Sequence, residues 1–494
     1  MSAAAAVRGA SGADGWGSFE INSLPPCVLE VFLTLLRGWL ATGRLPEDLR
    51  NIRQVGLPKP NKIVGGHLPA EAIRPLAVCS VWWRLASAVL LKSVRPWLEQ
   101  QGLDTKDRTE LTAALVQRDV DDGCGVVCVD YAQAFDRVCF PEVARCMRAD
   151  GFPPQVLGLL LAFWSQQVRW LEWNSYISED ACFTSCGLPQ GDSCAPFVMD
   201  YLIALGVRAT SRDGRAIRSY VYADDRCWTS KAVPDLIARK LSWDTWSGKV
   251  GLKEHGLKTE VLPPAECTAA GRAELERIGG LKASVKLLGC SIRGPGASKE
   301  LSKLENQRLQ DTELVVDMVA SLRFLNFRQA MDRLRVYATT KFNYGWVSAY
   351  PSEPRLRVLW HRMCGATQRY VYGPRQLMAA AVGATTHPSA VHATRLYGIC
   401  AAVRLRGLPL EGFRVYAFLK RKLRYLGAVT VPGGWQRYDV AVSWESPARD
   451  SHAIRDFFRH ASLQQLWKSG RREGRRAPDI PDPPPTSAEL CRVR

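Results

Sequence analysis

Two adjacent carboxylates interrupt a pair of strand-like segments at residues 218–230, and this feature constrains the fold most. The segment reads RSYVYADDRCWTS, with Asp224 and Asp225 between two runs rich in aromatic and β-branched residues. This pattern predicts a β-hairpin with the aspartates at its turn. Adjacent like charges repel, so we expect a nearby cation to offset the cost. An exposed acidic turn is the alternative, because aspartate is common in turns.

A third carboxylate follows a strand that the sequence predicts to be buried on both faces. Residues 126–129 form the continuous apolar run VVCV, and Asp130 comes directly after it. If this strand and the hairpin share a sheet, Asp130 and Asp224 can meet at one edge. Carboxylates in such a position can hold two cations about 4 Å apart for phosphoryl transfer. Two Mg²⁺ ions are expected, with Mn²⁺ as the alternative.

Strands and helices alternate irregularly through residue 300, which favours an α+β fold over a doubly wound sheet. From Leu301 onward the pattern becomes mostly helical and predicts a separate domain. Its clearest helical stripe consists of Leu314, Val315, Met318, Val319 and Leu322. Earlier segments are predicted as a helix at 27–40, a strand and helix within 73–101, helices within 141–165, strands within 167–186 and a strand at 286–292.

Positive charge is concentrated in the rear of the chain. The net charge is +18, and residues 301–494 hold 31 Lys and Arg against 15 Asp and Glu, whereas residues 1–300 hold 35 against 33. This distribution predicts a nearly neutral catalytic body followed by a region that binds a polyanion. The runs LKRKLR at 419–424 and SGRREGRR at 469–476 are candidate contact or nuclear-import stretches, with solvated helix faces as the alternative.

The sequence gives no sign of secretion or of a membrane span. The most apolar stretch, residues 27–40, carries Glu30 and Arg37, and the N-terminus lacks a signal-peptide pattern. Fifteen cysteines are scattered singly, which fits a reduced compartment. We therefore expect an intracellular protein without a membrane partner, and the basic runs favour the nucleus.

Three segments, in this order, resemble the palm motifs of reverse transcriptases: VDYAQAFDRV at 129–138, GLPQGD at 187–192 and YADD at 222–225. VGLPKP at 55–60 and IRPLAV at 73–78 resemble the fingers motifs that precede them. GLKEHGLKTEVL at 251–262 and KLLGCSI at 286–292 resemble the two that follow. The form is most similar to the non-LTR, LINE-type retrotransposon enzymes, on AFDRV, YADD, the Lys-Thr-Glu at 258–260 and GRLPEDLR at 43–50.

The resemblance implies a right-hand polymerase fold, with an antiparallel sheet plus helices in fingers and palm, then a mostly helical thumb and a basic C-terminal region. The expected divisions are a disordered N-terminal tail at 1–25, fingers at 26–125, palm at 126–295, thumb at 296–375, a basic and mostly helical nucleic-acid-binding region at 376–475, and a disordered Pro-rich tail at 476–494.

The resemblance also implies the catalytic residues. Asp130 and Asp224 would chelate both metal ions, with Asp225 as a less direct partner and the backbone carbonyl of Tyr131 as a further ligand. Lys258 would be the general acid for the leaving pyrophosphate.

The implied substrate residues surround this centre. Lys59 and Arg74 would clamp the incoming triphosphate, and Phe135 would lie under the sugar and exclude a ribose 2′-hydroxyl, which makes dNTPs the substrates. Gln190 would lie beside the sugar, and Gly191 would permit a close backbone approach. The implied primer grip consists of Leu288 and Gly289. An RNA template and a DNA primer are the implied partners.

Some family features have no counterpart in the sequence. No endonuclease, RNase H or zinc-knuckle pattern is evident, so we expect any endonuclease to be supplied elsewhere, and GDSCAP replaces the more usual Pro-Leu-Ser-Pro continuation. A viral RNA-dependent RNA polymerase is disfavoured by Phe135 and by Gln190 with Gly191. A group II intron maturase and a catalytically inactive RNA-binding relative remain alternatives.

Overall fold

The computed structural model describes residues 10–58, 73–101, 109–174, 176–211, 214–222, 225–294, 297, 300–367, 388–425, 429–431, 434–437 and 440–443. Lys59, Asp224, the run at 469–476 and the tail at 476–494 lie outside the described residues.

An N-terminal sheet is built from segments on both sides of residues 129–138. Its strand order is β2-β1-β4-β5, with β6 also paired to β4. The pairing of β1 with β2 is antiparallel and that of β1 with β4 is parallel. The strands are β1 (Asn51–Pro58), β2 (Ile73–Cys79), β4 (Val168–Trp173), β5 (Tyr176–Ile177) and β6 (Cys182–Phe183).

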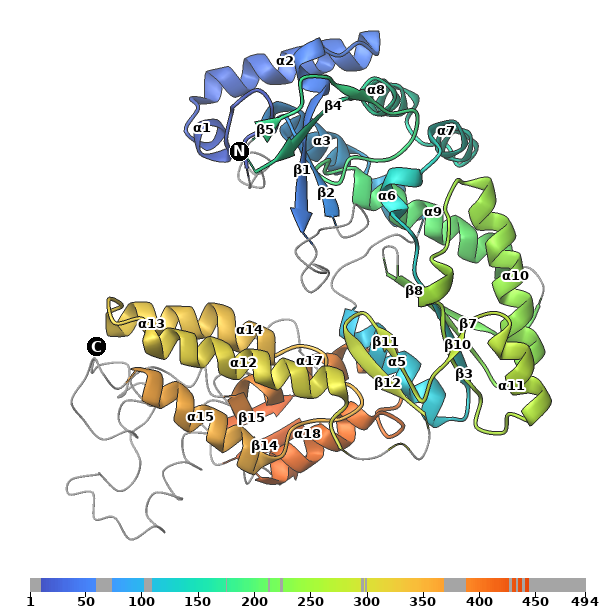
Figure 1. Ribbon diagram of the computed structural model, residues 1–494, viewed down its shortest axis with the longest axis vertical. Coiled ribbons are helices and arrows are strands. Elements are labelled where there is room, and N and C mark those ends of the chain that lie inside the picture. Colours follow the sequence, from blue (N-terminus) through green and yellow to red (C-terminus); the bar gives the residue numbers. More distant parts are fainter. Residues whose placement is uncertain are drawn as a thin grey trace.

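Helices surround this sheet in the upper part of Figure 1. Ser80 caps helix α3 (Val81–Ser93), since its hydroxyl accepts a hydrogen bond from the Trp82 amide. The helices are α1 (Ser18–Asn22), α2 (Pro26–Thr42), η2 (Glu47–Arg50), α3 (Val81–Ser93), α4 (Arg95–Gln100), α6 (Ala134–Arg137), α7 (Phe140–Ala149) and α8 (Pro154–Ser165).

A central sheet carries the segments that the sequence predicts to be catalytic. Its order is β10-β9-β3-β8-β7, with β3 antiparallel to both of its neighbours. Its strands are β3 (Gly125–Val129), β7 (Arg218–Tyr222), β8 (Asp225–Ser230), β9 (Glu260–Leu262) and β10 (Gly280–Leu281). The accompanying helices are α5 (Thr109–Asp121), α9 (Ala195–Thr210), α10 (Val233–Lys249), η5 (Gly256–Lys258) and α11 (Ala269–Glu276).

Strand β3 is apolar throughout because both of its faces are buried. Val127 and Val129 belong to a core cluster that includes Trp243 of α10. Val126 and Cys128 face a second cluster that includes residues of α5. A strand covered on both sides has no polar face, which explains the continuous run in the sequence.

The rear of the described chain is mostly helical. Its elements are α12 (Lys303–Ser321), α13 (Phe327–Arg333), the π-helical turn η6 (Leu334–Ala338), α14 (Thr339–Phe342), α15 (Glu353–Thr367), α17 (Pro388–Leu405) and α18 (Arg414–Tyr425). Strands β13 (Val429–Val431), β14 (Gly434–Arg437) and β15 (Val440–Ser443) form a small antiparallel sheet.

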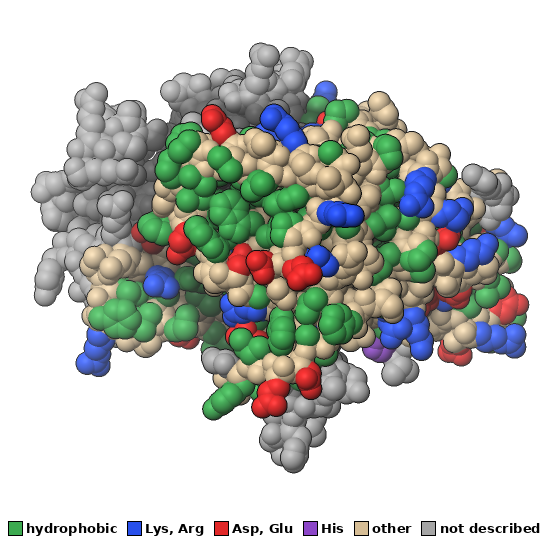
Figure 2. Space-filling model, turned by 90° about the horizontal axis from the view of Figure 1, so that it is seen from above, with side chains coloured by type: hydrophobic (Ala, Val, Ile, Leu, Met, Phe, Trp, Pro, Cys, Tyr) green, Lys and Arg blue, Asp and Glu red, His purple; other side chains and the backbone are tan. Residues whose placement is uncertain are grey.

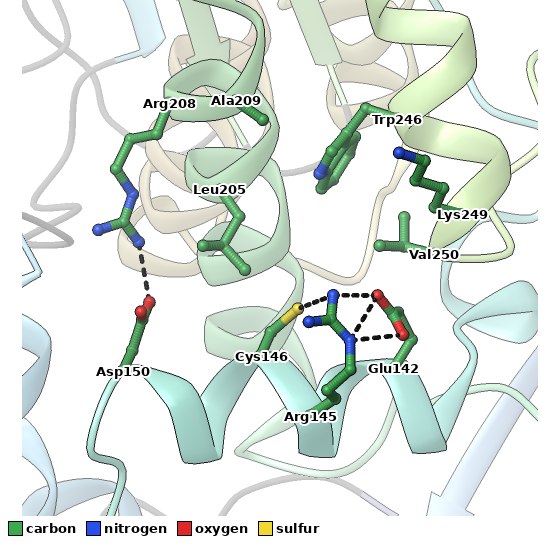
Figure 3. Close-up of a pocket in the computed structure, with 10 residues that line it drawn as sticks. All are labelled: Glu142, Arg145, Cys146, Asp150, Leu205, Arg208, Ala209, Trp246, Lys249 and Val250. Carbon is green, nitrogen blue, oxygen red and sulfur yellow. Dashed lines mark hydrogen bonds and ion pairs between the residues drawn. The ribbon is translucent and has the colours of Figure 1, made fainter.

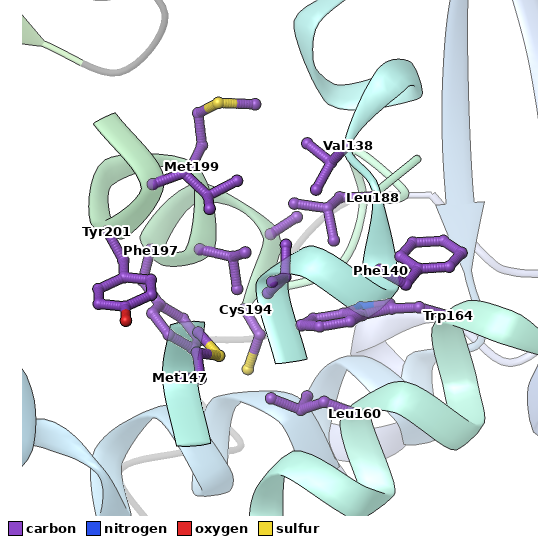
Figure 4. Close-up of a cluster of buried hydrophobic side chains, with 14 of the residues drawn as sticks. Val138, Phe140, Met147, Leu160, Trp164, Leu188, Cys194, Phe197, Met199 and Tyr201 are labelled. Carbon is purple, nitrogen blue, oxygen red and sulfur yellow. The ribbon is translucent and has the colours of Figure 1, made fainter. Parts of the chain in front are cut away.

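The largest buried cluster joins the two sheets through α7, α8 and α9. Figure 4 shows part of it, with Trp164 of α8 among side chains from α7 and α9. Each fully buried large apolar side chain contributes about 1.5–3 kcal/mol. This core fixes the position of the strand ends that carry the carboxylates.

The predicted α+β class is confirmed, with mixed sheets and many helices. The sheets, however, cross the boundary expected at residue 125. Strand β4, from the segment assigned to the palm, pairs with β1. Helix α5, from the segment assigned to the fingers, is tied to the hairpin of β11 (Ser284–Leu287) and β12 (Cys290–Arg293), since the Gln117 side chain and the Arg293 backbone exchange two 2.9 Å hydrogen bonds.

Residues 10–25 are packed against the rest of the fold, so the expectation of a disordered tail at 1–25 is wrong for them. The Ser80 hydroxyl donates to Asp14 at 2.6 Å, and Arg53 donates to the Ser11 carbonyl at 2.8 Å. The Trp16 ring packs edge-on against Trp82 with centroids 5.4 Å apart. The sequence does not predict these contacts, because a segment rich in small residues and glycine resembles a disordered tail.

Two further expectations need correction. The segment 286–292 is not one strand, because Leu288 and Gly289 turn the chain between β11 and β12. The predicted stripe on α12 is helical, but Leu314 and Met318 are exposed while Val315 and Val319 are buried. The buried face of α12 includes Thr312, Val315 and Val319, each of which is offset along the helix from the exposed Leu314 and Met318.

Helix α2, predicted at 27–40, is confirmed, and apolar residues lie on its outer as well as its inner side. Phe32 and Leu36 are buried, whereas Val28, Val31 and Leu35 are exposed. Figure 2 looks onto the molecule from the α2 side and shows apolar side chains gathered there. Among the described helices, none is long and apolar enough to cross a membrane.

Candidate active site

The register of the central sheet brings the expected carboxylates to adjacent strand ends. Val129, the last residue of β3, pairs with Arg226 of β8. One further step of this register places Asp130 across from Asp225. Tyr222, the last residue of β7, pairs with Asp225, the first residue of β8. The sequence prediction that Asp130 and the hairpin share one sheet edge is therefore supported for Asp225.

Lys258 lies at the same place. Its ammonium nitrogen is 2.6 Å from Oδ2 of Asp130, and both side chains are partly exposed. The Asp130 carbonyl accepts a 2.9 Å hydrogen bond from the His255 amide, and the His255 carbonyl accepts one of 2.8 Å from the Lys258 amide. Two successive backbone contacts thus hold the short helix η5 against the end of β3.

The chemistry of this donor set fits a divalent cation. Carboxylate oxygens are the hard ligands that Mg²⁺ and Mn²⁺ prefer. The Asp130 carboxylate already forms an ion pair with the ammonium of Lys258. No group of three or more His, Cys, Asp and Glu side chains positioned for a metal occurs within the described residues. Asp224, the third expected ligand, lies outside those residues.

The side chain of Tyr131 points into the core. Its hydroxyl lies 2.7 Å from the Ser247 hydroxyl and accepts a 3.0 Å hydrogen bond from Trp243. Burial raises the pKa of this phenol above its ordinary value. The phenol is thus a structural group, and ligation by the Tyr131 backbone carbonyl stays a prediction.

Phe135 and the GLPQGD segment are joined directly. The Phe135 carbonyl accepts a 2.6 Å hydrogen bond from the Leu188 amide, and the Val138 carbonyl accepts one of 2.9 Å from the Gly187 amide. The Phe135 side chain is partly buried against the main core. Gly187 has a φ of 93°, and a Cβ there would lie 2.6 Å from the Asp136 carbonyl oxygen. Glycine is therefore required for this contact.

Gly191 permits a close approach, but the approach is to strand β2. A Cβ on Gly191 would lie 2.2 Å from the carbonyl oxygen of Ala77. Gln190 beside it is exposed, and so is Arg74, three residues before Ala77 on β2. The structure thus brings the GLPQGD segment to the strand that carries Arg74, while the nucleotide contacts of Gln190, Gly191 and Arg74 stay predictions.

The expected primer grip is a tight turn fixed by the rear helical region. Leu288 and Gly289 both have positive φ, 50° and 72°, which is unusual for leucine. The Leu288 carbonyl accepts a 2.6 Å hydrogen bond from the Tyr344 hydroxyl, and the Gly289 carbonyl accepts one of 2.6 Å from Arg308 of α12. These bonds couple the turn to α12 and to the chain after α14.

Two buried aspartates that support the site were not singled out in the sequence. Asp119 of α5 accepts hydrogen bonds from Tyr220 at 2.7 Å and Thr229 at 2.6 Å, and also pairs with Arg218. It thereby holds both strands of the β7–β8 hairpin. Burial, followed by the charge of Asp119, raises the pKa of Tyr220. No sequence signal marks Asp119, because its partners lie about a hundred residues away.

The second is Asp192, which follows Gln190 and Gly191 and is fully buried. It accepts hydrogen bonds from Trp164 at 2.9 Å and from the Cys194 amide at 3.1 Å. Burial raises its pKa above the ordinary value. This carboxylate anchors the start of α9, and the GD pair in the sequence could have drawn attention to it.

A cavity of about 370 Å³ lies between α7, α9 and α10. Figure 3 shows Trp246, Leu205 and Val250 around it, with the Arg145–Glu142 and Arg208–Asp150 pairs at its edge. None of the expected catalytic or substrate residues lines it. The candidate active site is therefore the end of strand β3 with the start of β8 beside it, and not this cavity.

Comparison with known proteins agrees with the site. Residues 57–292 match the family model described as reverse transcriptase (RNA-dependent DNA polymerase). No curated protein matched the sequence. The match supports the reverse transcriptase family, which is a family of polymerases and nucleotidyltransferases, and it agrees with the α+β polymerase fold.

Similar solved structures include two telomerases. One is apo telomerase from Candida tropicalis, truncated from the C-terminal domain, with 13% identity and a TM-score of 0.37 over 51% of this chain and 54% of that chain. The other is telomerase from Candida albicans in complex with a TWJ fragment of telomeric RNA, with 10% identity and a TM-score of 0.40 over 81% of this chain and 68% of that chain. The chain thus spans about half of the first of these structures.

Proposed function

We propose that this chain, whose residues 57–292 match the reverse transcriptase family, is an RNA-directed DNA polymerase. It extends a primer 3′-hydroxyl with dNTPs on an RNA template. The observation that carries the proposal is the convergence at one sheet edge, where the register of β3 and β8 sets Asp130 beside Asp225 and Lys258 pairs with Asp130.

Each residue has a task in this reaction. Asp130 and Asp224, with Asp225 as the less direct partner, would hold the cations. Divalent ions bound there would activate the primer hydroxyl and neutralise charge on the leaving pyrophosphate. The Lys258 ammonium, released from Asp130, would donate its proton to a pyrophosphate oxygen.

The substrate residues lie around that centre. Arg74 and Lys59 bind the triphosphate, because a guanidinium suits bidentate contact with phosphate. Phe135 excludes a 2′-hydroxyl, and Gln190 lies beside the sugar. The turn at Leu288 and Gly289 holds the primer end, supported by its bonds to Tyr344 and Arg308.

We place the chain with the LINE-type enzymes and infer a retrotransposon-derived polymerase of the nucleus. The support is the set of motifs AFDRV, YADD and Lys-Thr-Glu together with the basic rear region. DNA synthesis is favoured over RNA synthesis because an aromatic ring, not a hydrogen-bonding side chain, stands at position 135.

Primer extension tests the proposal. Wild type, Asp224→Ala and the control Asp235→Ala are compared on an RNA template with a DNA primer, dNTPs and Mg²⁺. Asp235 is an acidic residue at the start of α10 that pairs with Arg215. Asp224→Ala should lower incorporation by at least about 10³-fold, since it removes a group that acts in the transition state. Asp235→Ala should stay near wild type.

Equal incorporation by wild type and Asp224→Ala would contradict the proposal. Absence of incorporation in all three proteins would favour the inactive RNA-binding relative.

A further inference from the structure

A buried arginine lies directly beneath the candidate metal site. Arg226 follows Asp225 in β8, and its side chain is fully buried. Its guanidinium carbon lies 3.1 Å from the centre of the Tyr131 ring, and Tyr131 follows Asp130. The stack therefore joins Tyr131, which follows the expected ligand Asp130, to Arg226, which follows the expected ligand Asp225.

An acidic partner joins this stack from a third segment. Glu254 lies 3.6 Å from Arg226 and 2.8 Å from the ammonium of Lys240. Lys240 also pairs with Asp244 at 2.7 Å. The side chains of Arg226, Lys240 and Glu254 are at most 12% exposed. We call these three residues the Arg226 network.

The backbone around Glu254 leads to the catalytic groups. Tyr131 and Glu254 form an isolated antiparallel bridge. The Ala132 amide donates to the Lys253 carbonyl at 2.9 Å, and the His255 amide donates to the Asp130 carbonyl at the same distance. Three residues later comes Lys258, whose ammonium reaches Asp130. A shift of Glu254 would therefore move both members of the Asp130–Lys258 pair.

Buried ion pairs of this kind commonly add little to the free energy of unfolding. Desolvation of two charges commonly equals or exceeds their attraction, so an apolar replacement is often as stable. What an arginine supplies here is a flat cation that stacks on an aromatic ring while it pairs with a carboxylate. Lysine carries the same charge but lacks the planar group.

We propose that Arg226 is a positioning residue, and that the Arg226 network holds the Asp130 and Lys258 segments in the geometry that binds cations. This inference rests on the proposed function for its role in catalysis. The three side chains of the network are buried behind the expected ligands. The network acts through Tyr131 and Glu254, as residues behind metal ligands do when they orient them.

The test uses the full chain with Arg226→Lys and, because one variant can fail to fold, Glu254→Gln. Arg239→Lys is the matched control, since Arg239 is as deeply buried on α10 but bonds to Thr210, Ser211 and Ser219. Two quantities are measured without catalysis. They are hydrogen exchange at the Ala132 and His255 amides without metal, and the affinity for Tb³⁺, read by luminescence and corrected with Asp130→Ala.

We expect Arg226→Lys and Glu254→Gln to speed exchange at both amides by at least about tenfold and to weaken Tb³⁺ binding by about 10- to 100-fold. Arg239→Lys should change the melting temperature alone. Amide exchange and Tb³⁺ affinity within twofold of wild type in both network variants would overturn the inference. Lost protection with unchanged Tb³⁺ affinity would overturn it as well, because the network would then hold backbone but not the site.

The two proposals fail separately. A wild type that incorporates no dNTP, yet binds Tb³⁺ through Asp130 and loses this binding in the network variants, would refute the polymerase and support the positioning role. An Arg226→Lys variant that extends primers as well as wild type, at unchanged dNTP KM and kcat, would refute the positioning role and leave the polymerase standing.

Discussion

At the scale of single residues, position in a strand decided what the sequence could reveal. The position of Asp130 could be predicted because the apolar run before it indicates a strand buried on both faces, and its catalytic role stays a prediction. The position of Arg226 could not be predicted, because alternation along β8 does not tell which polar residue turns inward to meet Tyr131 and Glu254. Buried ion pairs depend on partners that only the fold brings together.

Phe135→Ala tests the role of one side chain in substrate choice. Removal of the ring should let a ribose 2′-hydroxyl enter, and the ratio of ribonucleotide to deoxynucleotide incorporation should rise by about tenfold or more. Single-nucleotide extension with each substrate gives kcat/KM for both. Since Phe135 is only partly buried, the variant should fold, which circular dichroism would check. Unchanged discrimination would assign the ring to the core alone.

At the scale of elements, periodicity in the sequence predicts helices and strands but not the turns between them. The run KLLGCSI was expected to be one strand, yet Leu288 and Gly289 turn the chain with positive φ. A leucine in that conformation gives no turn signal. The bonds from Tyr344 and Arg308 hold the turn in place, and both residues lie far along the chain.

The packing of α17 gives a prediction for pH. His392 is fully buried against Tyr350, and neither ring nitrogen has a hydrogen-bond partner within the described residues. Burial, with a smaller effect of the Lys422 ammonium, holds the pKa of His392 well below its usual 6.5. Below pH 6.5 the unfolded chain therefore binds a proton that the folded chain does not. As the pH falls below 6.5, this residue should therefore lower the free energy of unfolding by up to about 1.4 kcal/mol for each pH unit.

His392→Phe should remove that part of the pH dependence, because a ring of similar size can stack on Tyr350 without titrating. Denaturant unfolding at pH 7.0, 6.0 and 5.0 measures the slope for both proteins. An equal slope in wild type and variant would show that the imidazole is not held neutral in the fold.

At the scale of the whole molecule, the charge distribution separates a neutral front from a basic rear. The sequence predicted this division but not which basic residues face solvent. In the run at 419–424, Lys420, Arg421 and Arg424 are exposed, whereas Lys422 is buried and paired with Glu353. Three of the four cations in this run of α18 are therefore exposed to solvent.

Neutralising those three residues to Gln should weaken binding of an RNA–DNA template-primer. The slope of log K against log salt concentration should become shallower by up to about 2.1–2.7, since each of the three lost phosphate contacts removes about 0.7–0.9. The control changes Arg272, Arg277 and Lys282, three exposed cations on and after α11, to Gln. A fluorescence anisotropy titration from 50 to 300 mM salt gives both slopes. Equal slopes for the two triple variants would remove α18 from the binding surface.

The central claim is spatial, and cleavage by bound Fe²⁺ tests it most directly. Fe²⁺ replaces Mg²⁺ at oxygen ligands, and with ascorbate and peroxide it cuts the backbone beside the ion. We predict cuts around residue 130 and around residues 224–225 in the same protein, with both sets lost on addition of Mg²⁺ or in Asp130→Ala. Cuts at one of the two segments alone, or cuts that persist in Asp130→Ala, would show that the strand end and the hairpin do not share cations.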